Sequence, residues 1–436
     1  MKRPVYLWLM LALLAVLAAA CGGQANNEVV PEATALPATT APEAPPEEAA
    51  TLPPPVIVED GGEAQVEEPT PVEEPAPAGA TFPWPADRFG YGTQSHAVVG
   101  DPAFAMDAIR NQLGLDWVKV QVEWPLVEPD PGVYQWFFYD GVVAEANRQG
   151  LNLMFSVVGA PAWTRSAGTE NGPPDDFNLY ANFLRELLNH YPNQVHAIEV
   201  WNEQNIDREW ATAQGLSPVV YVDFLQRAYE AVKAVNPDII VISGALAPSG
   251  VHDLVTSYDD FIYLDEALAA GMLNYADCVG VHHNGYNIGP DVAWDQAGSS
   301  PKAATATFRG PFDNPHHSWS FKTTVETYAQ KVQALDPNKK LCVTEFGWGS
   351  SEGYDSYPEG FGFVNDNSLE EQAQYIVQAF QQMQASGTVW LAFQFNFDFG
   401  NKGNGPTDDP VPYSIVDVNG VPRPAFGAIA AMEKVR

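Results

Sequence analysis

A chain of 436 residues in which 12% are aromatic and only 17% are charged can bury a large core, which excludes an intrinsically disordered protein. Its 55 acidic residues far outnumber its 21 basic ones, and the formal net charge is −34. Because nucleic-acid binding needs a positively charged face, this balance argues against a nucleic-acid partner and favours a neutral ligand.

The N-terminus has the architecture of an export signal. Lys2 and Arg3 precede an apolar run, Val5–Ala20, that is too short to span a membrane comfortably. Residues 1–20 are therefore predicted to be a signal peptide. The small residues that lead into Cys21 resemble a bacterial lipobox, although Ala18 stands where leucine is usual. The resemblance implies a lipidated Cys21 and an extracytoplasmic protein anchored to a membrane through that lipid. An ordinary cleaved signal peptide is the alternative.

Residues 21–82 are predicted to form a linker that follows the lipidated cysteine. The segment is rich in Pro, Ala, Glu and Thr and carries about a dozen carboxylates but no Lys or Arg. Such a composition cannot bury enough apolar surface to offset the entropy of ordering. Because its prolines favour extended backbone and its carboxylates repel one another, we expect an extended, disordered stalk.

Residues 83–436 are predicted to form one α/β domain, a (β/α)8 TIM barrel. Apolar runs alternate with amphipathic helical patterns, which is typical of repeated βα units around a parallel sheet. An open doubly wound sheet is the alternative, but no glycine-rich fingerprint follows the first strand. The eight strands are expected at Phe89–Ser95, Trp117–Trp124, Asn152–Pro161, Ala197–Asn205, Ile239–Pro248, Cys278–Asn287, Lys340–Trp348 and Val389–Phe399.

Two carboxylates stand at the C-terminal ends of predicted strands, where barrel enzymes place their active sites. The fourth strand ends with Asn202-Glu203, and the seventh presents Glu345. Carboxylates on nonadjacent strands of one barrel mouth can face each other across a sugar. A retaining glycosidase uses such a pair, one protonated to donate to the leaving oxygen and one ionised to attack the anomeric carbon.

These motifs resemble those of the clan A glycoside hydrolases, the retaining barrel enzymes that include families 5, 39, 42 and 51. Trp201-Asn202-Glu203 is similar to the Asn-Glu pair of the clan, and Thr344-Glu345-Phe346-Gly347-Trp348 is similar to its nucleophile motif. The resemblance covers roughly residues 89–436, and the segment Trp124–Trp136 looks like its counterpart in family 39. It implies that Glu203 is the acid/base, Glu345 the nucleophile and Asn202 a hydrogen-bond partner of the sugar 2-hydroxyl.

Three further positions follow from the resemblance as substrate-binding residues. His283 and Tyr286 correspond to a His and a Tyr at the end of strand six, where the Tyr donates to the nucleophile. The family spacing is His-x-Tyr, so which of His282 and His283 faces the site is open. Lys119 stands where the clan has an arginine, and it can supply charge without a bidentate fork.

Aromatic residues near the barrel mouth are candidates for stacking on the apolar faces of a sugar. We expect Trp124, Trp163 and Trp348 in this role, with core packing as the alternative for each. The resemblance implies a platform Trp on strand eight, but Phe393 or Gln394 occupies that place here.

No cofactor and no metal are expected. The His pairs at 282–283 and 316–317 come with no HExxH motif or cysteine cluster. Cys278 and Cys342 lie on adjacent predicted strands, but cysteines in the middle of a barrel are usually buried thiols, so we expect no disulfide.

The sequence thus predicts a retaining glycoside hydrolase that acts outside the cytoplasm on oligo- or polysaccharides, with a β-linked glycan as the substrate class implied by the resemblance. The long loop Ile288–Ser318 is expected to wall the cleft and to govern substrate choice. Three alternatives stay open: a carbohydrate-binding lipoprotein without catalysis, a barrel used as an interaction scaffold, and a transglycosylase that uses the same intermediate.

Overall fold

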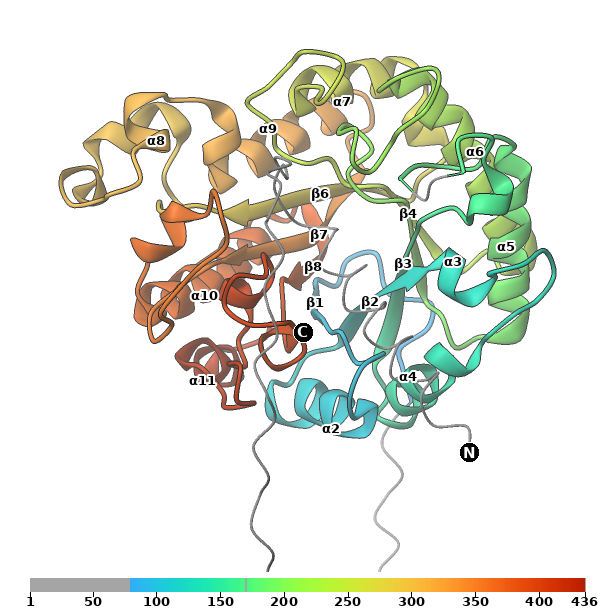
Figure 1. Ribbon diagram of the computed structural model, residues 1–436, viewed down its shortest axis with the longest axis horizontal. Coiled ribbons are helices and arrows are strands. Elements are labelled where there is room, and N and C mark those ends of the chain that lie inside the picture. The colour runs from blue at the N-terminus through green and yellow to red at the C-terminus, as the bar shows by residue number, and fades with distance from the viewer. Residues whose placement is uncertain (1–78, 169–170, 436) are drawn as a thin grey trace, which may run out of the picture. The chain divides into compact units, whose positions relative to one another are not determined.

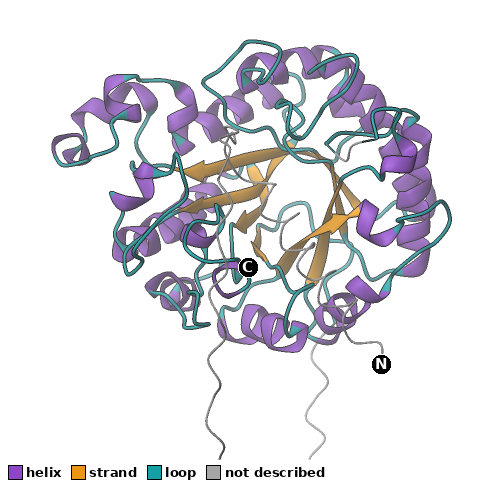
Figure 2. Ribbon diagram, in the orientation of Figure 1, coloured by secondary structure: helices purple, strands orange, loops and turns teal. Residues whose placement is uncertain are grey.

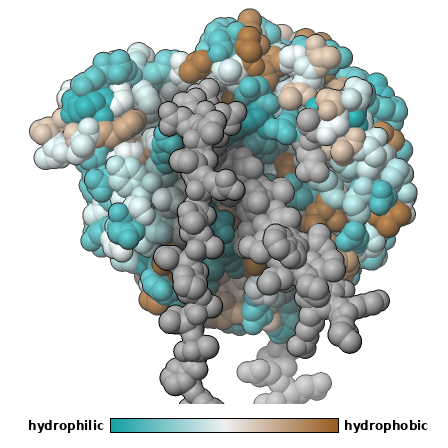
Figure 3. Space-filling model, in the orientation of Figure 1, coloured by the Kyte–Doolittle hydropathy of each residue, from teal (hydrophilic) through white to brown (hydrophobic). Residues whose placement is uncertain are grey.

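The computed structural model describes residues 79–168 and 171–435. The predicted signal peptide, Cys21 and most of the predicted stalk lie outside the described residues. The described part of the chain belongs to one compact unit. Within it, no helix is both long and apolar enough to cross a membrane. The described surface that Figure 3 shows is mainly hydrophilic, with hydrophobic residues in small separate patches.

Eight parallel strands close into a barrel in the order β1 to β8, which confirms the predicted (β/α)8 fold (Figures 1 and 2). Each strand pairs with its neighbour in sequence, and β8 returns to pair with β1. Most predicted strands extend past the observed C-terminal end because they include residues of the following loop. The strands are β1 (Gly90–Gln94), β2 (Trp117–Glu123), β3 (Asn152–Val158), β4 (Ala197–Val200), β5 (Ile240–Ser243), β6 (Cys278–Gly285), β7 (Lys340–Trp348) and β8 (Val389–Gln394).

A ring of helices surrounds the barrel (Figure 2). Several begin at a serine that caps free backbone N–H groups, and Ser368 forms a reciprocal capping box with Glu371 at the start of α10. The α-helices are α2 (Pro102–Asp107), α3 (Trp124–Val127), α4 (Phe137–Arg148), α5 (Phe177–His190), α6 (Pro218–Val235), α7 (Asp260–Ala269), α8 (Gly310–Asp313), α9 (Phe321–Gln333), α10 (Leu369–Ser386) and α11 (Pro424–Ala431).

The N-terminal end of the barrel is closed by a layer of apolar side chains. Trp84, just before β1, packs edge-on against Trp117 of β2. The segment that leads into β1 therefore also closes this end of the barrel. Contacts between the chain and the barrel begin slightly before residue 83, the predicted start of the domain. The Asn152 side chain donates to the carbonyl of Thr81, and the ring of Phe82 meets His196 edge-on.

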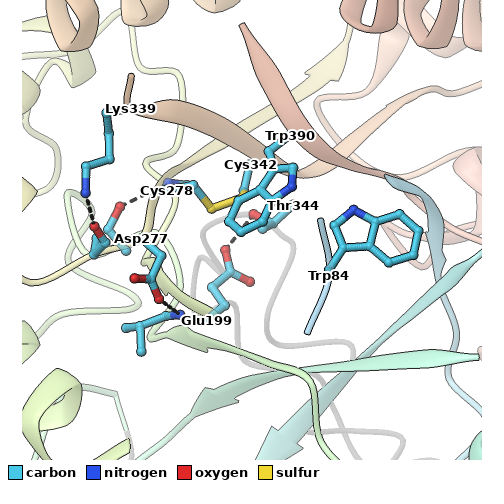
Figure 4. The surroundings of a disulfide bond; sticks show 12 residues. Trp84, Glu199, Asp277, Cys278, Lys339, Cys342, Thr344 and Trp390 are labelled. Atoms are coloured by element: carbon cyan, nitrogen blue, oxygen red, sulfur yellow. Dashed lines mark hydrogen bonds between the residues drawn. A yellow bond between two sulfur atoms is a disulfide. The ribbon is translucent and has the colours of Figure 1, made fainter. Parts of the chain in front are cut away.

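A disulfide joins Cys278 of β6 to Cys342 of β7 in this layer, so the expectation of free thiols is wrong (Figure 4). Gly280 lies opposite Cys342 in the pairing of the two strands, which makes Cys278 and Cys342 diagonal neighbours. Both side chains point into the barrel, and their Cα atoms lie 5.8 Å apart, within the range that a bridge spans. Strand assignment alone did not reveal this shared orientation.

We expect the double variant Cys278→Ala/Cys342→Ala to unfold at lower temperature than the wild type. The bridge closes a loop with a sequence separation of 64 residues, and the chain-entropy account gives about 4 kcal/mol for such a loop as an upper figure. Calorimetry in the absence of reductant measures the change, and dithiothreitol should lower the wild-type midpoint toward that of the variant. A midpoint within 1 °C of wild type in both experiments would contradict a stabilising bridge.

Candidate active site

Side chains of alternate residues on each strand point into the barrel. On β2, Trp117 joins the apolar layer, Lys119 lies above it, and Gln121 reaches the open end. Lys119 is fully buried. Its Nζ lies 3.2 Å from Glu199 Oε2 and 3.0 Å from Glu345 Oε1. Lys119 therefore contacts the candidate nucleophile from beneath and does not line the open cavity.

Glu203 follows β4 in a strained turn. Trp201 and Glu203 have φ values of 77° and 45°, in the left-handed region that residues other than glycine seldom adopt. The turn is held by Trp201, which is buried among aromatic rings and donates its indole N–H to the Glu209 carbonyl. Glu203 N–H donates to the carbonyl of Ala245, just after β5. This turn directs Asn202 and Glu203 into one cavity.

Glu345 reaches the cavity because β7 contains a bulge. Val281 of β6 lies opposite Val343, but the next residue, His282, lies opposite Glu345, so Thr344 is an extra residue. Thr344 Oγ1 donates to buried Glu199 beneath the site, and Glu345 lines the cavity above. A bulge shifts the alternation by one residue, so that two consecutive side chains face the interior.

On β6 the residue that faces the site is His282, so His283 must be replaced as a site residue. Strict alternation from Cys278 directs His282 and Asn284 into the barrel, and both line the cavity. His283 points outward, where its Nε2 donates to the Ser318 carbonyl at 3.1 Å and burial lowers its pKa to about 4. The alternation of inward and outward side chains along β6 could have identified His282 from the sequence.

His282 connects the two candidate catalytic carboxylates. Its Nδ1 lies 3.2 Å from Glu203 Oε1 and 3.9 Å from Glu345 Oε2, while its Nε2 lies 3.7 Å from Glu199 Oε1. Burial alone would lower the pKa of His282, but Glu345, Glu203 and Glu199 outweigh burial and raise it. Glu203 and Glu345 therefore face the same imidazole ring from two strands. Asn284 Nδ2 also donates to Glu345 Oε2 at 3.2 Å, and so makes the contact to the candidate nucleophile that the resemblance implied for Tyr286.

Neighbouring groups lower the pKa of both carboxylates. Burial raises the pKa of Glu345, but the charges of His282 and Lys119 more than offset burial and lower it below its usual range. Burial likewise raises the pKa of Glu203, but hydrogen bonds and charges from His282 and Arg208 hold it at about 2. Arg208 Nη2 lies 3.2 Å from Glu203 Oε2, and 41% of its side chain is exposed. Arg208 lies in a loop and was not among the predicted site residues.

The cavity over these groups has a volume of about 410 Å³, within the range of small-molecule sites. Its walls combine amide and carboxylate groups with aromatic rings, which suits a ligand with polar edges and apolar faces. Tyr286 lines it, with its ring against Trp319 and Phe363; burial and the charge of Glu203 raise its pKa to about 12. The aromatic lining residues are Tyr286, Phe308, Trp319, Phe361, Phe363, Phe395 and Tyr413.

The three tryptophans expected to stack on a sugar lie outside this lining. Trp124 and Trp348 are fully buried, and their indole N–H groups donate to Glu128 Oε2 and to the Ile288 carbonyl. Trp163 is partly buried and donates to the Glu128 carbonyl. All three rings pack around the barrel, which is core packing, the alternative to sugar stacking stated for each of them.

Near β8 the ring that reaches the cavity is Phe395, the residue that follows the strand. Phe393, one alternation earlier, belongs to the apolar layer, and Gln394 accepts a hydrogen bond from Thr93. Phe395 is joined to Asn396 by a cis peptide bond. Phe395 therefore lies one or two residues after the place where the resemblance implied an aromatic residue on strand eight.

No family model and no curated protein matches the chain, whereas many solved structures do. A family 39 glycoside hydrolase from the gut symbiont Bacteroides cellulosilyticus WH2 is 21% identical with a TM-score of 0.56, over 80% of this chain and 64% of that one. This chain thus spans slightly less than two thirds of that enzyme. A monomeric beta-xylosidase from Caulobacter crescentus CB15 is 17% identical with a TM-score of 0.52, over 80% and 69% of the two chains.

A GH5_18 protein from Streptomyces cattleya, solved in complex with Manb1-4GlcNAc, is 15% identical with a TM-score of 0.53, over 78% of this chain and 79% of that one. The chain shares the fold of these glycoside hydrolases. At such identities the similarity establishes the barrel architecture alone, so the activity has to be argued from the residues of the cavity.

Proposed function

We propose that the chain is a retaining glycoside hydrolase that cleaves β-linked oligo- or polysaccharides. The observation that carries this proposal is the placement of Glu203 and Glu345, from the ends of β4 and β7, within 4.0 Å of one nitrogen of His282 in an aromatic-lined cavity. Two carboxylates in one cavity with rings for sugar stacking are what double displacement needs.

In the proposed reaction, Glu345 attacks the anomeric carbon while Glu203 donates a proton to the leaving glycosidic oxygen. The C–O bond to the aglycone breaks, and an ester bond forms between the sugar and Glu345. Glu203, now ionised, then takes a proton from water, which attacks the same carbon and releases Glu345. Lys119 and His282 favour the ionised Glu345 that the first step requires and that the second step regenerates.

Glu203 must be protonated for the first step, yet a pKa of about 2 favours its ionised form. Arg208 is the neighbour that a substrate can displace, because much of its side chain is exposed. An aglycone that moves Arg208 aside and excludes water removes one favourable charge and adds desolvation, and both changes raise the pKa of Glu203.

We therefore expect Arg208→Gln to shift the basic limb of the kcat/KM profile to higher pH, by about one pH unit because solvent screens the partly exposed pair. The sign follows because loss of the cation raises the pKa of the acid, so the protonated form persists to higher pH. Arg208→Lys keeps the charge and serves as the matched control. A basic limb that stays unchanged in Arg208→Gln would rule out this role for Arg208.

The β-linked substrate class is supported by the names of similar structures, one a beta-xylosidase and one bound to Manb1-4GlcNAc. The test is a panel of aryl β- and α-glycosides and β-linked polysaccharides, with the anomer first released read by proton NMR. The proposal expects β-glycoside hydrolysis with a β-configured first product. Binding without turnover would favour a carbohydrate-binding protein, and products longer than the substrate would favour a transglycosylase.

We also propose that the chain is exported and lipid-anchored through Cys21. The Cys278–Cys342 bridge supports an oxidising compartment, because such bridges persist mainly outside the cytoplasm. Expressed in a bacterium with the lipidation pathway, the full-length chain is expected in the membrane fraction, and Cys21→Ser is expected in the soluble extracytoplasmic fraction. Equal distribution of both proteins would contradict an anchor at Cys21.

A further inference from the structure

A second cluster of ligand-type side chains lies outside the catalytic pair, where the segment before α7 meets the long loop before α9. Asp259, His316 and His317 each offer one ligand atom, and the three atoms lie within 4.8 Å of one another. Asp259 Oδ2 lies 2.8 Å from His317 Nε2 and 3.9 Å from His316 Nε2. Neither histidine is used in the proposed reaction.

The surroundings of His317 orient it as a metal ligand. Its ring stacks on Phe261 with a centroid separation of 3.7 Å, which fixes the plane of the imidazole. Its Nδ1, opposite the nitrogen that faces Asp259, lies 3.8 Å from Oδ1 of fully buried Asp260. Histidine ligands usually direct their second nitrogen at a carboxylate, which sets the tautomer and raises the basicity of the ring.

Asp259 can serve a metal without losing its structural role. Its Oδ1 accepts the backbone N–H of Ile262 and caps α7, which leaves Oδ2 directed toward the two histidines. Asp260 is likewise held in place, since Tyr328 Oη donates to its Oδ2 at 3.0 Å. The carboxylates on both sides of His317 are thus fixed by α7 and α9.

We propose that Asp259, His316 and His317 bind a divalent transition metal ion of the zinc class, with water completing the coordination. Two imidazoles and one carboxylate are a common zinc ligand set. Tetrahedral coordination at usual bond lengths places ligand atoms about 3.3 Å apart. His316 Nε2 therefore has to move toward Asp259, and Asp259 Oδ2 and His317 Nε2, which lie 2.8 Å apart, have to separate to admit the ion. The His316 side chain is 36% exposed and gives the ion a route from solvent, while its Nδ1 bonds to Ser318 Oγ.

The metal would brace one wall of the substrate cavity. Trp319, two residues after His317, lines the cavity, and Phe308 lines it from the same loop. Pro248, which follows β5 in the loop leading to α7, lines it as well. An ion held by Asp259 and both histidines ties these two loops together. This consequence rests on the proposed function, whereas the binding of the metal does not.

The test is titration of the chelator-treated full-length chain with Zn²⁺ by calorimetry and with Co²⁺ by visible absorption. The proposal expects one equivalent of Zn²⁺ and the intense d–d bands of four-coordinate Co²⁺. His316→Ala and Asp259→Asn should each weaken binding by at least about tenfold. His190→Ala is the matched control, because His190 is equally exposed and pairs with Asp140, and it should bind like the wild type.

Circular dichroism checks the fold of each variant. If Asp259→Asn unfolds, Zn²⁺ binding by His316→Ala still tests the proposal, because the partly exposed His316 side chain is not part of the core. Less than 0.2 equivalents of bound Zn²⁺, or equal affinity in His316→Ala and the wild type, would overturn the proposal and leave an ion pair at a helix start. Activity toward glycosides does not enter these readouts, so failure of the proposed function leaves the metal proposal standing.

Discussion

Replacement of Glu345 by glutamine is expected to lower kcat/KM for an aryl β-glycoside by at least about 10⁴-fold, which corresponds to loss of the covalent route. Glutamine keeps the size of the side chain but cannot form the glycosyl ester. Initial rates measure the effect, and a proteolysis pattern like that of the wild type shows that the barrel is intact. Wild-type activity in Glu345→Gln would remove Glu345 as the nucleophile.

Glu203→Gln separates the two roles when substrates with different leaving groups are compared. A general acid contributes about 10² to 10⁴-fold, so hydrolysis of a poor leaving group such as methanol should fall by that amount. A dinitrophenolate needs no proton, so formation of the glycosyl-enzyme from its glycoside should stay near the wild-type rate. The same large loss of this step for both substrates would contradict an acid role for Glu203.

The second large effect is expected at Lys119, whose Nζ lies between buried Glu199 and Glu345. Lys119→Met leaves two buried carboxylates without this counter-charge, and breaking a buried ion pair costs about 3 to 5 kcal/mol. Urea unfolding measures the loss. Lys322→Met is the control, because Lys322 pairs with Glu326 on the surface, and we expect a change below about 1 kcal/mol there.

The variant should also change the pH dependence of activity. Lys119 lowers the pKa of Glu345, so its loss raises that pKa, and the nucleophile then ionises only at higher pH. The acidic limb of the kcat/KM profile is expected to move upward, whereas Lys322→Met leaves it in place. Adding Glu199→Gln to Lys119→Met should recover part of the lost stability. An unchanged stability and an unchanged acidic limb would show that Lys119 does not stabilise the ionised nucleophile.

The barrel could be predicted from the sequence because its strands are buried apolar runs with helical patterns between them. The segment predicted as Lys340–Trp348 agrees with β7 at both ends. Glu203 and Glu345 were found because each stands where an apolar run ends. Their shared contact with His282 depends on a bulge at Thr344, which no local pattern revealed.

Most differences between the predicted and the observed site residues come from the direction in which a side chain points. Counting by twos from Cys278 along β6 would have favoured His282 over His283. The expected tryptophans are strongly hydrophobic residues near strand ends, but burial of large rings around the barrel competes with exposure to a ligand. Trp319 and Arg208 come from loops, whose path depends on tertiary contacts rather than on a repeating pattern.

The proposed reaction passes through a covalent bond to Glu345. A 2-deoxy-2-fluoro-β-glycoside with a dinitrophenolate leaving group slows the second step, so the intermediate accumulates and can be read by mass spectrometry of proteolytic peptides. We expect one fluorosugar to be added to the peptide that contains Glu345, and no addition in Glu345→Gln. A label on a different residue, or no label while an unsubstituted glycoside turns over with inversion, would contradict it.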